Sequence, residues 1–162
     1  MPRTHDACDI ARWLVAWASD FDEGVVSNLK LQKLLYYAQG NALARWGRPL
    51  FRQQIEAWTH GPVVADVYHQ YKGFGTGPIV PEVDMDWSIT DSTTDSLLAS
   101  VWRTYGGFSA WKLREMTHSE SPWRDTFVEG ERHKVIDQDV IRRHFERLTA
   151  EQAHGQRRGA RD

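Results

Sequence analysis

The sequence predicts a mainly α, single-domain helical bundle of about six helices, with a short β-hairpin or strand element around residues 50–60. Three observations predict it. Apolar residues recur at helical spacing in several segments, and these segments are bounded by cap and turn residues. A length of 162 residues favours one domain. The sequence contains no internal repeat and no linker between two separate cores, so we expect one domain over residues 1–150.

Two helices are expected in the first third of the chain. In residues 6–19, apolar residues recur at i, i+3, i+4 and i+7, namely Ile10, Trp13, Leu14 and Trp17. A second helix is expected from the N-cap Ser27 to about Trp46, with Gly47 as the residue that ends it. Apolar side chains cover more than half of its circumference, which predicts a central position in the bundle.

The middle of the chain predicts short elements and a loop. Residues 55–58 combine Ile and Trp, which suit a pleated surface, so a short strand is expected there. Pro62 is well placed as the first residue of a helix that reaches Tyr71. Residues 73–86 hold three glycines and two prolines, which is typical of a loop.

The last third predicts four more helices and a tail. The helices are expected over residues 94–105, 110–117, 121–127 and 140–150. Ser109 is the expected N-cap of the second of these, and Ser121-Pro122 opens the third. Residues 151–162 are basic and poor in apolar side chains, so we expect them to be a disordered tail.

Composition and charge exclude several classes of protein. The net charge of −2 and the pI of about 6.4 argue against nucleic acid as the main partner. A single cysteine, Cys8, rules out a disulfide within one chain and favours a reducing compartment. The longest apolar stretch is interrupted by Arg12 and is too short to cross a bilayer, and Asp6 and Asp9 break any signal-peptide pattern. The sequence therefore predicts a cytoplasmic protein that does not enter a membrane.

Catalytic and metal-binding patterns are weak. The seven histidines do not follow the spacing of metal ligands, so we expect no metal and no cofactor. His118 lies close to Ser119 and Ser121, which would be the elements of a small hydrolase. Serines this close in sequence more often cap the following helix, so we expect no catalytic residue.

Three other segments carry more specific patterns. Residues 27–40 read Ser-Asn-Leu-Lys-Leu-Gln-Lys-Leu-Leu-Tyr-Tyr-Ala-Gln-Gly. Residues 55–64 read Ile-Glu-Ala-Trp-Thr-His-Gly-Pro-Val-Val and are followed by Val67-Tyr68. Residues 117–123 read Thr-His-Ser-Glu-Ser-Pro-Trp. Together, in this order and spacing, they resemble the Panacea domain, also called the SocA-like antitoxin domain, over residues 8–147.

The resemblance implies an antitoxin of a bacterial or phage toxin–antitoxin system. Such a protein neutralises a cognate protein toxin, encoded beside it, by direct binding and without catalysis. One branch of the family is a proteolytic adaptor that delivers its toxin to an AAA+ protease, which is the alternative function. A small hydrolase is a weaker alternative. So is a DNA-binding autoregulator that would use Arg142, Arg143 and Arg147 of the last helix.

The candidate partner-binding residues are Lys30, Lys33, Tyr37, Trp58, His60, Tyr68, His118 and Trp123. Lys30 and Lys33 are three residues apart and Tyr37 follows at i+4, so they can share one helix face that offers charge and an aromatic ring to an acidic partner. The alternative is that the lysines are solvated and the tyrosine is core. A structural role is equally open for His60, beside a Gly-Pro turn. Tyr68 and Trp123 are expected to pack inward, so their structural role is favoured over a contact role.

Overall fold

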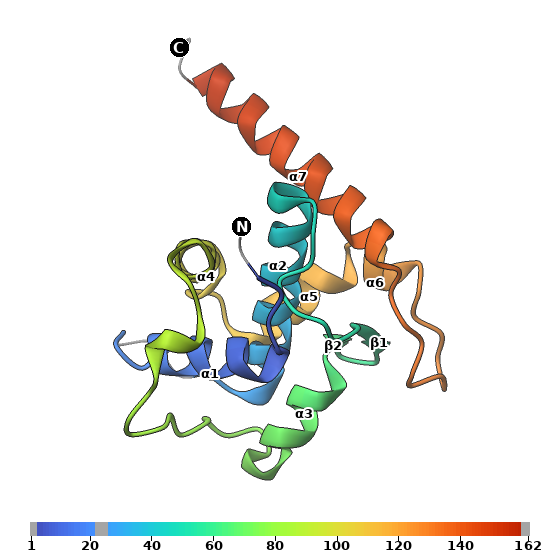
Figure 1. Cartoon of the computed structure of the whole chain (residues 1–162). Helices are drawn as coiled ribbons and strands as arrows, with labels where there is room; N and C mark the ends of the chain where they lie inside the picture. The colour runs from blue at the N-terminus through green and yellow to red at the C-terminus, as the bar shows by residue number, and fades with distance from the viewer. Residues whose placement is uncertain (1–2, 22–25, 160–162) are drawn as a thin grey trace.

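The computed structural model describes residues 3–21 and 26–159, which form seven α-helices, two short 3-10 helices and one antiparallel hairpin around a central helix (Figure 1). The α-helices are α1 (Ala7–Ala18), α2 (Asn28–Trp46), α3 (Ala65–Tyr71), α4 (Ser92–Tyr105), α5 (Ala110–His118), α6 (Ser121–Arg124) and α7 (Gln138–Gly159). The strands are β1 (Glu56–Trp58) and β2 (Gly61–Val63), and the 3-10 helices are η1 (Lys72–Phe74) and η2 (Trp87–Ile89). The predicted mainly α class with a hairpin near residues 50–60 is confirmed.

Helix α2 is the centre of the molecule, as its apolar circumference predicts. It begins at the predicted cap, where Ser27 Oγ accepts a hydrogen bond from the Lys30 amide at 3.3 Å. It ends at Gly47, whose φ of 69° is the left-handed conformation that glycine adopts without strain. Residues 30–40 are all buried, and α1, α4, α5 and α7 pack around them.

Buried polar side chains of α2 hold the segment that contains the hairpin. Gln39 Oε1 accepts hydrogen bonds from the Leu50 and Phe51 amides at 2.8 and 3.1 Å, and its Nε2 donates to the Phe51 carbonyl at 3.0 Å. Gln32 Oε1 accepts from the Val64 amide at 2.9 Å. Burying a polar group is costly unless it is hydrogen-bonded. These hydrogen bonds therefore pair the buried amide of each glutamine and fix the backbone that it contacts.

The packing of α7 on α2 depends on a glycine. A Cβ atom at Gly40 would lie 2.2 Å from the ring of Phe145, so the ring occupies the space that any other residue would need. Phe145 is buried there and makes edge contacts with the rings of Tyr36 and Tyr37. This contact brings the start of α7 close to the central tyrosines.

Two helix starts and ends differ from the predictions. Pro62 does not begin a helix but lies in β2, where it pairs with Ala57, and α3 starts three residues later at Ala65. Residues 61–63 are extended because they pair with β1, so the helix can begin only after Val63. Helix α6 ends at Arg124 instead of Phe127.

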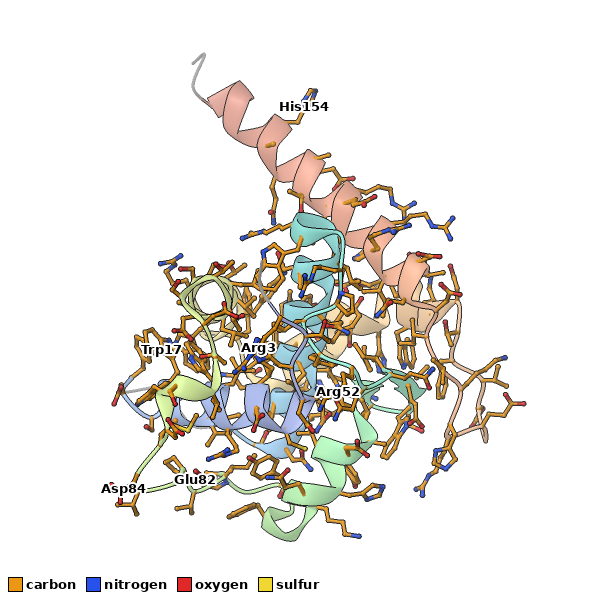
Figure 2. All side chains as sticks on the ribbon, in the orientation of Figure 1. Arg3, Trp17, Arg52, Glu82, Asp84 and His154 are labelled. Atoms are coloured by element: carbon orange, nitrogen blue, oxygen red, sulfur yellow. The ribbon has the colours of Figure 1, made fainter. Side chains whose placement is uncertain are left out.

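Residues 151–159, which the sequence analysis assigns to a disordered tail, continue α7 in the structure. Helix α7 runs from Gln138 to Gly159, and Figure 1 shows its last turns projecting away from the other helices. His154 lies on this projecting part (Figure 2). Residues 150–158 are rich in Ala, Glu, Gln and Arg, which are strong helix formers, so nothing stops the helix at residue 150. Residues 160–162 of the predicted tail lie outside the described residues.

A helix that crosses a bilayer has to be both long and apolar. Within residues 3–21 and 26–159, no helix combines the length and the apolar character of a membrane span.

Candidate functional site

The three sequence motifs meet at the junction of α2, the hairpin, α5 and α6. Lys33 Nζ of the first motif donates a hydrogen bond to the Pro62 carbonyl of the second at 3.0 Å. Trp123 Nε1 of the third donates to the Trp58 carbonyl of the second at 2.7 Å. The conspicuous residues of the sequence pattern therefore bind one another.

A carboxylate joins the first motif to the third. The hydroxyls of Tyr36 and Tyr37 each donate to a different oxygen of Glu120 at 2.9 Å. Burial raises the pKa of Glu120 to about 7, although the two tyrosine hydroxyls act in the opposite direction. His144 Nε2 of α7 lies 3.6 Å from the same carboxylate, so side chains of α2 and α7 converge on it.

The predicted exposed face of Lys30, Lys33 and Tyr37 does not exist in this structure, because all three residues are buried. Lys30 Nζ donates to the Gly106 carbonyl at 2.6 Å and lies 5.3 Å from the centroid of the Trp102 ring. The alternative that these lysines are solvated is wrong as well, whereas Tyr37 is a core residue. The long lysine stems pack inside and their ammonium groups end on backbone carbonyls.

Lys33 is the most unusual of these residues. Its side chain is 0% exposed. Burial, and secondarily the positive charge of Arg114, lower the pKa of Lys33 to about 7. No carboxylate of the described residues lies within 4.0 Å of its ammonium group.

Gly61 allows the hairpin to sit on Lys33. Its φ is +114°, a conformation that side chains rarely adopt. A Cβ atom there would lie 2.7 Å from Lys33 Cε and 2.9 Å from Thr117 Oγ1. Gly61 is therefore required both for the turn and for close packing on α2 and α5.

An aromatic and basic surface surrounds the hairpin, and we name it the hairpin surface. Its members are Trp58, His60, Tyr68, Trp111, Arg114 and His118. The Trp58 and Tyr68 rings make an edge contact at 4.9 Å. Arg114 Nε donates to His60 Nδ1 at 3.1 Å, and the guanidinium lies 4.4 Å from the centroid of the Trp111 ring. Trp111 is 57% exposed, so this surface offers a large apolar ring to a partner.

His118 is positioned by stacking. Its ring lies 3.9 Å from that of Trp123, nearly parallel at 2°, and Trp123 stacks in turn on Phe127 at 4.7 Å. Burial, followed by the charges of Arg114 and Lys33, lowers the pKa of His118.

The hydrolase hypothesis needs a hydrogen bond between His118 and a serine hydroxyl. His118 Nε2 is buried without a hydrogen-bond partner among the described residues. The nearby Ser119 hydroxyl donates to the Met116 carbonyl instead, at 2.8 Å. The arrangement therefore lacks the contact that activates a serine nucleophile.

Of the three arginines considered for DNA binding, Arg142 is paired with acids of its own helix. Arg142 lies 3.1 Å from Asp139 and 3.8 Å from Glu146, and Arg143 donates to the Asp139 carbonyl at 3.3 Å. Across the described part of the chain, no three His, Cys, Asp or Glu side chains are grouped closely enough to hold a metal ion.

The structure separates the eight predicted contact residues into two groups. Trp58, His60, Tyr68 and His118 lie on the hairpin surface, and whether they bind a partner stays a prediction. Trp123 is buried beneath that surface, and Lys30, Lys33 and Tyr37 are internal.

The sequence analysis missed three residues of this region: Trp111, Arg114 and Glu120. Trp111 and Leu113 are two residues apart, so they lie on different sides of a helix, and only Leu113 is buried. Arg114 follows Trp111 at i+3, the spacing at which the two side chains meet. Glu120 had no comparable signal, because its tyrosine partners are more than 80 residues away in sequence.

Comparison with known proteins identifies the family. The family model described as "Antitoxin SocA-like, Panacea domain" matches residues 31–124. "Antitoxin SocA" of Caulobacter vibrioides (strain NA1000 / CB15N) is 42% identical over 140 residues, which cover 80% of this chain and 73% of the relative. No solved structure matches the chain. The matched residues 31–124 include the buried Lys33, the two tyrosines, the hairpin, Glu120 and Trp123, and the chain belongs to the SocA-like antitoxin family with a Panacea domain.

Proposed function

We propose that this protein is an antitoxin that neutralises a protein toxin by binding it directly, without catalysing a reaction on it. The observation that carries the proposal is membership of the SocA-like family, with 42% identity to a protein named Antitoxin SocA. We further propose that the toxin is encoded by the neighbouring gene and that the hairpin surface makes the contact.

The hairpin surface has the properties of a protein-binding site. Trp58, Tyr68 and Trp111 are large aromatic side chains that are at least partly exposed. Trp and Tyr are the residues most enriched among those that dominate binding energy. The surface is also held in place before binding, because the hairpin is hydrogen-bonded to Lys33 and Trp123. A preformed surface loses little conformational entropy when it binds.

Co-expression tests the proposed function. Induction of the neighbouring gene alone is expected to stop growth, and simultaneous expression of this protein is expected to restore it, with the two proteins purifying as a complex. Persistent growth arrest with no complex would contradict the proposal.

The same experiment separates binding alone from delivery to a protease. If neutralisation is by occlusion, the toxin accumulates in the complex with an unchanged half-life. If the protein is an adaptor, the half-life of the toxin falls when this protein is present and recovers in a strain that lacks the AAA+ protease.

A pair of tryptophan variants locates the contact. Trp111→Ala removes the 57%-exposed ring of the hairpin surface, and Trp87→Ala removes a 43%-exposed ring of η2, which packs against Trp13 and Trp17 of α1. We expect Trp111→Ala to weaken binding of the toxin by roughly 10- to 100-fold, the range for an interface anchor. Trp87→Ala is expected to bind normally. Equal effects, or a larger effect of Trp87→Ala, would contradict the placement of the site.

A further inference from the structure

Arg114 is a cation whose position is fixed from two sides. Its Nε donates to His60 Nδ1 at 3.1 Å, and its guanidinium lies over the Trp111 ring at 4.4 Å. The imidazole acceptor and the ring hold the planar fork in one orientation, and a guanidinium fixed in this way is ready to bind a carboxylate through two parallel hydrogen bonds.

Among the described residues, the Arg114 guanidinium group has no acidic partner. The two terminal guanidinium nitrogens make no hydrogen bond to a described residue, and no described carboxylate lies within 4.0 Å. Two carboxylates of neighbouring elements are engaged elsewhere. Glu56 is 2.9 Å from His133, and Glu120 accepts from the two tyrosines.

Three other basic side chains lie near Arg114. Burial lowers the pKa of Lys33 in α2, His60 in the hairpin turn and His118 in α5, and the nearby positive charge of Arg114 lowers each pKa further. We name these four residues the basic cluster. The positive charges of Lys33 and Arg114 repel each other, and this repulsion is unfavourable. A negative charge from a partner would reduce it.

We propose that the basic cluster binds a carboxylate side chain of the toxin, an Asp or Glu that docks on Arg114 beside the Trp111 ring. This inference rests on the proposed antitoxin function and adds the chemistry that the contact recognises. Arg114 supplies the paired hydrogen bonds, and Trp111 supplies an apolar wall that excludes water and strengthens them.

A protein carboxylate fits this site better than a nucleic-acid phosphate does. The basic cluster is compact and lies beside the exposed Trp111 ring. Phosphate backbones, by contrast, are bound by extended basic surfaces. The chain as a whole has a net charge of −2, which opposes binding of a polyanion.

Two charge-matched variants test the proposal on the toxin complex. Arg114→Gln and Lys112→Gln each remove one positive charge from α5, but Lys112 is exposed and its side chain makes no hydrogen bond or ion pair with a described residue. We expect Arg114→Gln to weaken binding by roughly 10- to 100-fold and to make the affinity less dependent on salt, whereas Lys112→Gln changes it by less than about 3-fold. Equal small effects of both variants, with normal binding by the wild type, would overturn the inference and leave the antitoxin function intact.

A probe that needs no toxin tests the site separately. Acetylated triglutamate is titrated into the wild-type protein and into Arg114→Gln while the side-chain NMR signals of His60, His118 and the Trp111 indole are followed. Saturable shifts in the wild type that disappear in Arg114→Gln are expected. No shifts in the wild type, or shifts only with a DNA duplex of equal charge concentration, would overturn the assignment to a protein carboxylate whether or not a toxin is bound.

Discussion

Single residues at the motif junction control how stability depends on pH. Glu120 is an acid in a largely buried site, and its side chain is only 15% exposed. The pKa of its folded form is about 7, above the ordinary value of 4.5. The folded state therefore binds this proton more tightly than the unfolded state does. The resulting stabilisation is complete below pH 4.5 and is lost as the pH rises through about 7.

Glu120→Gln should remove this dependence. As the pH rises from 4.5 to 7.5, we expect the free energy of unfolding of the wild type to fall relative to that of the variant, by up to about 3 kcal/mol. Urea denaturation at a series of pH values measures the difference. A difference that is constant across this range would show that the folded carboxyl titrates normally.

Gly61 is a second residue whose role can be isolated. Gly61→Ala combines a positive φ with a Cβ placed against Lys33 Cε and Thr117 Oγ1, so we expect it to destabilise the fold by about 1–3 kcal/mol. Gly107→Ala is the matched control, because a Cβ there meets no atom within 4 Å. Thermal unfolding compares them. A Gly61→Ala variant as stable as Gly107→Ala would mean that the turn can adopt another backbone conformation.

At the scale of elements, the hairpin is held by the helices beneath it more than by its own ladder. Each strand has only three residues, and an isolated hairpin of that size is marginal in water. The Trp123 indole and the Lys33 ammonium bind its two strands, and the Ala57 amide donates to the Lys134 carbonyl at 2.8 Å on the outer side.

Trp123→Phe tests this dependence. The variant keeps an aromatic ring between His118 and Phe127 but loses the hydrogen bond to the Trp58 carbonyl, which we expect to cost about 1 kcal/mol. Amide exchange should quicken in residues 56–63 and stay unchanged in α4. Faster exchange spread evenly over the whole protein would indicate a general loss of packing.

The sequence predicts elements better than it predicts the exposure of their polar residues. The caps Ser27 and Ser109 and the terminator Gly47 were found because they act locally. The burial of Lys30 and Lys33 could not be read from helical spacing, since it depends on carbonyls at Gly106 and Pro62 that are distant in the sequence. A lysine usually indicates an exposed face, and here that rule fails.

At the scale of the whole molecule, the residues of the three motifs divide into an internal group and a group on the hairpin surface. Inside the molecule, Tyr36 and Tyr37 bind Glu120, and Lys33 and Trp123 bind backbone carbonyls of the hairpin. They form a rigid support for the hairpin. Figure 1 shows the hairpin on the side of α2 opposite α4, with the projecting end of α7 well away from it.

A second aromatic cluster lies on the other side of the molecule. Trp17 of α1 stacks on Trp13 at 4.8 Å and lies near α4 in Figure 2. Trp13 Nε1 donates to Asp95 at 3.0 Å, which ties α1 to α4. Trp13 and Trp17 therefore connect helices by packing. The exposed Trp111 ring lies instead on the hairpin surface.

Hydrogen exchange on the purified complex with the toxin tests the central claim most directly. The account predicts that toxin binding slows exchange in residues 56–63 and 110–118, relative to the free protein, and leaves α1 and α4 unchanged. Protection confined to α1 and α4, or no complex with the product of the neighbouring gene, would contradict it.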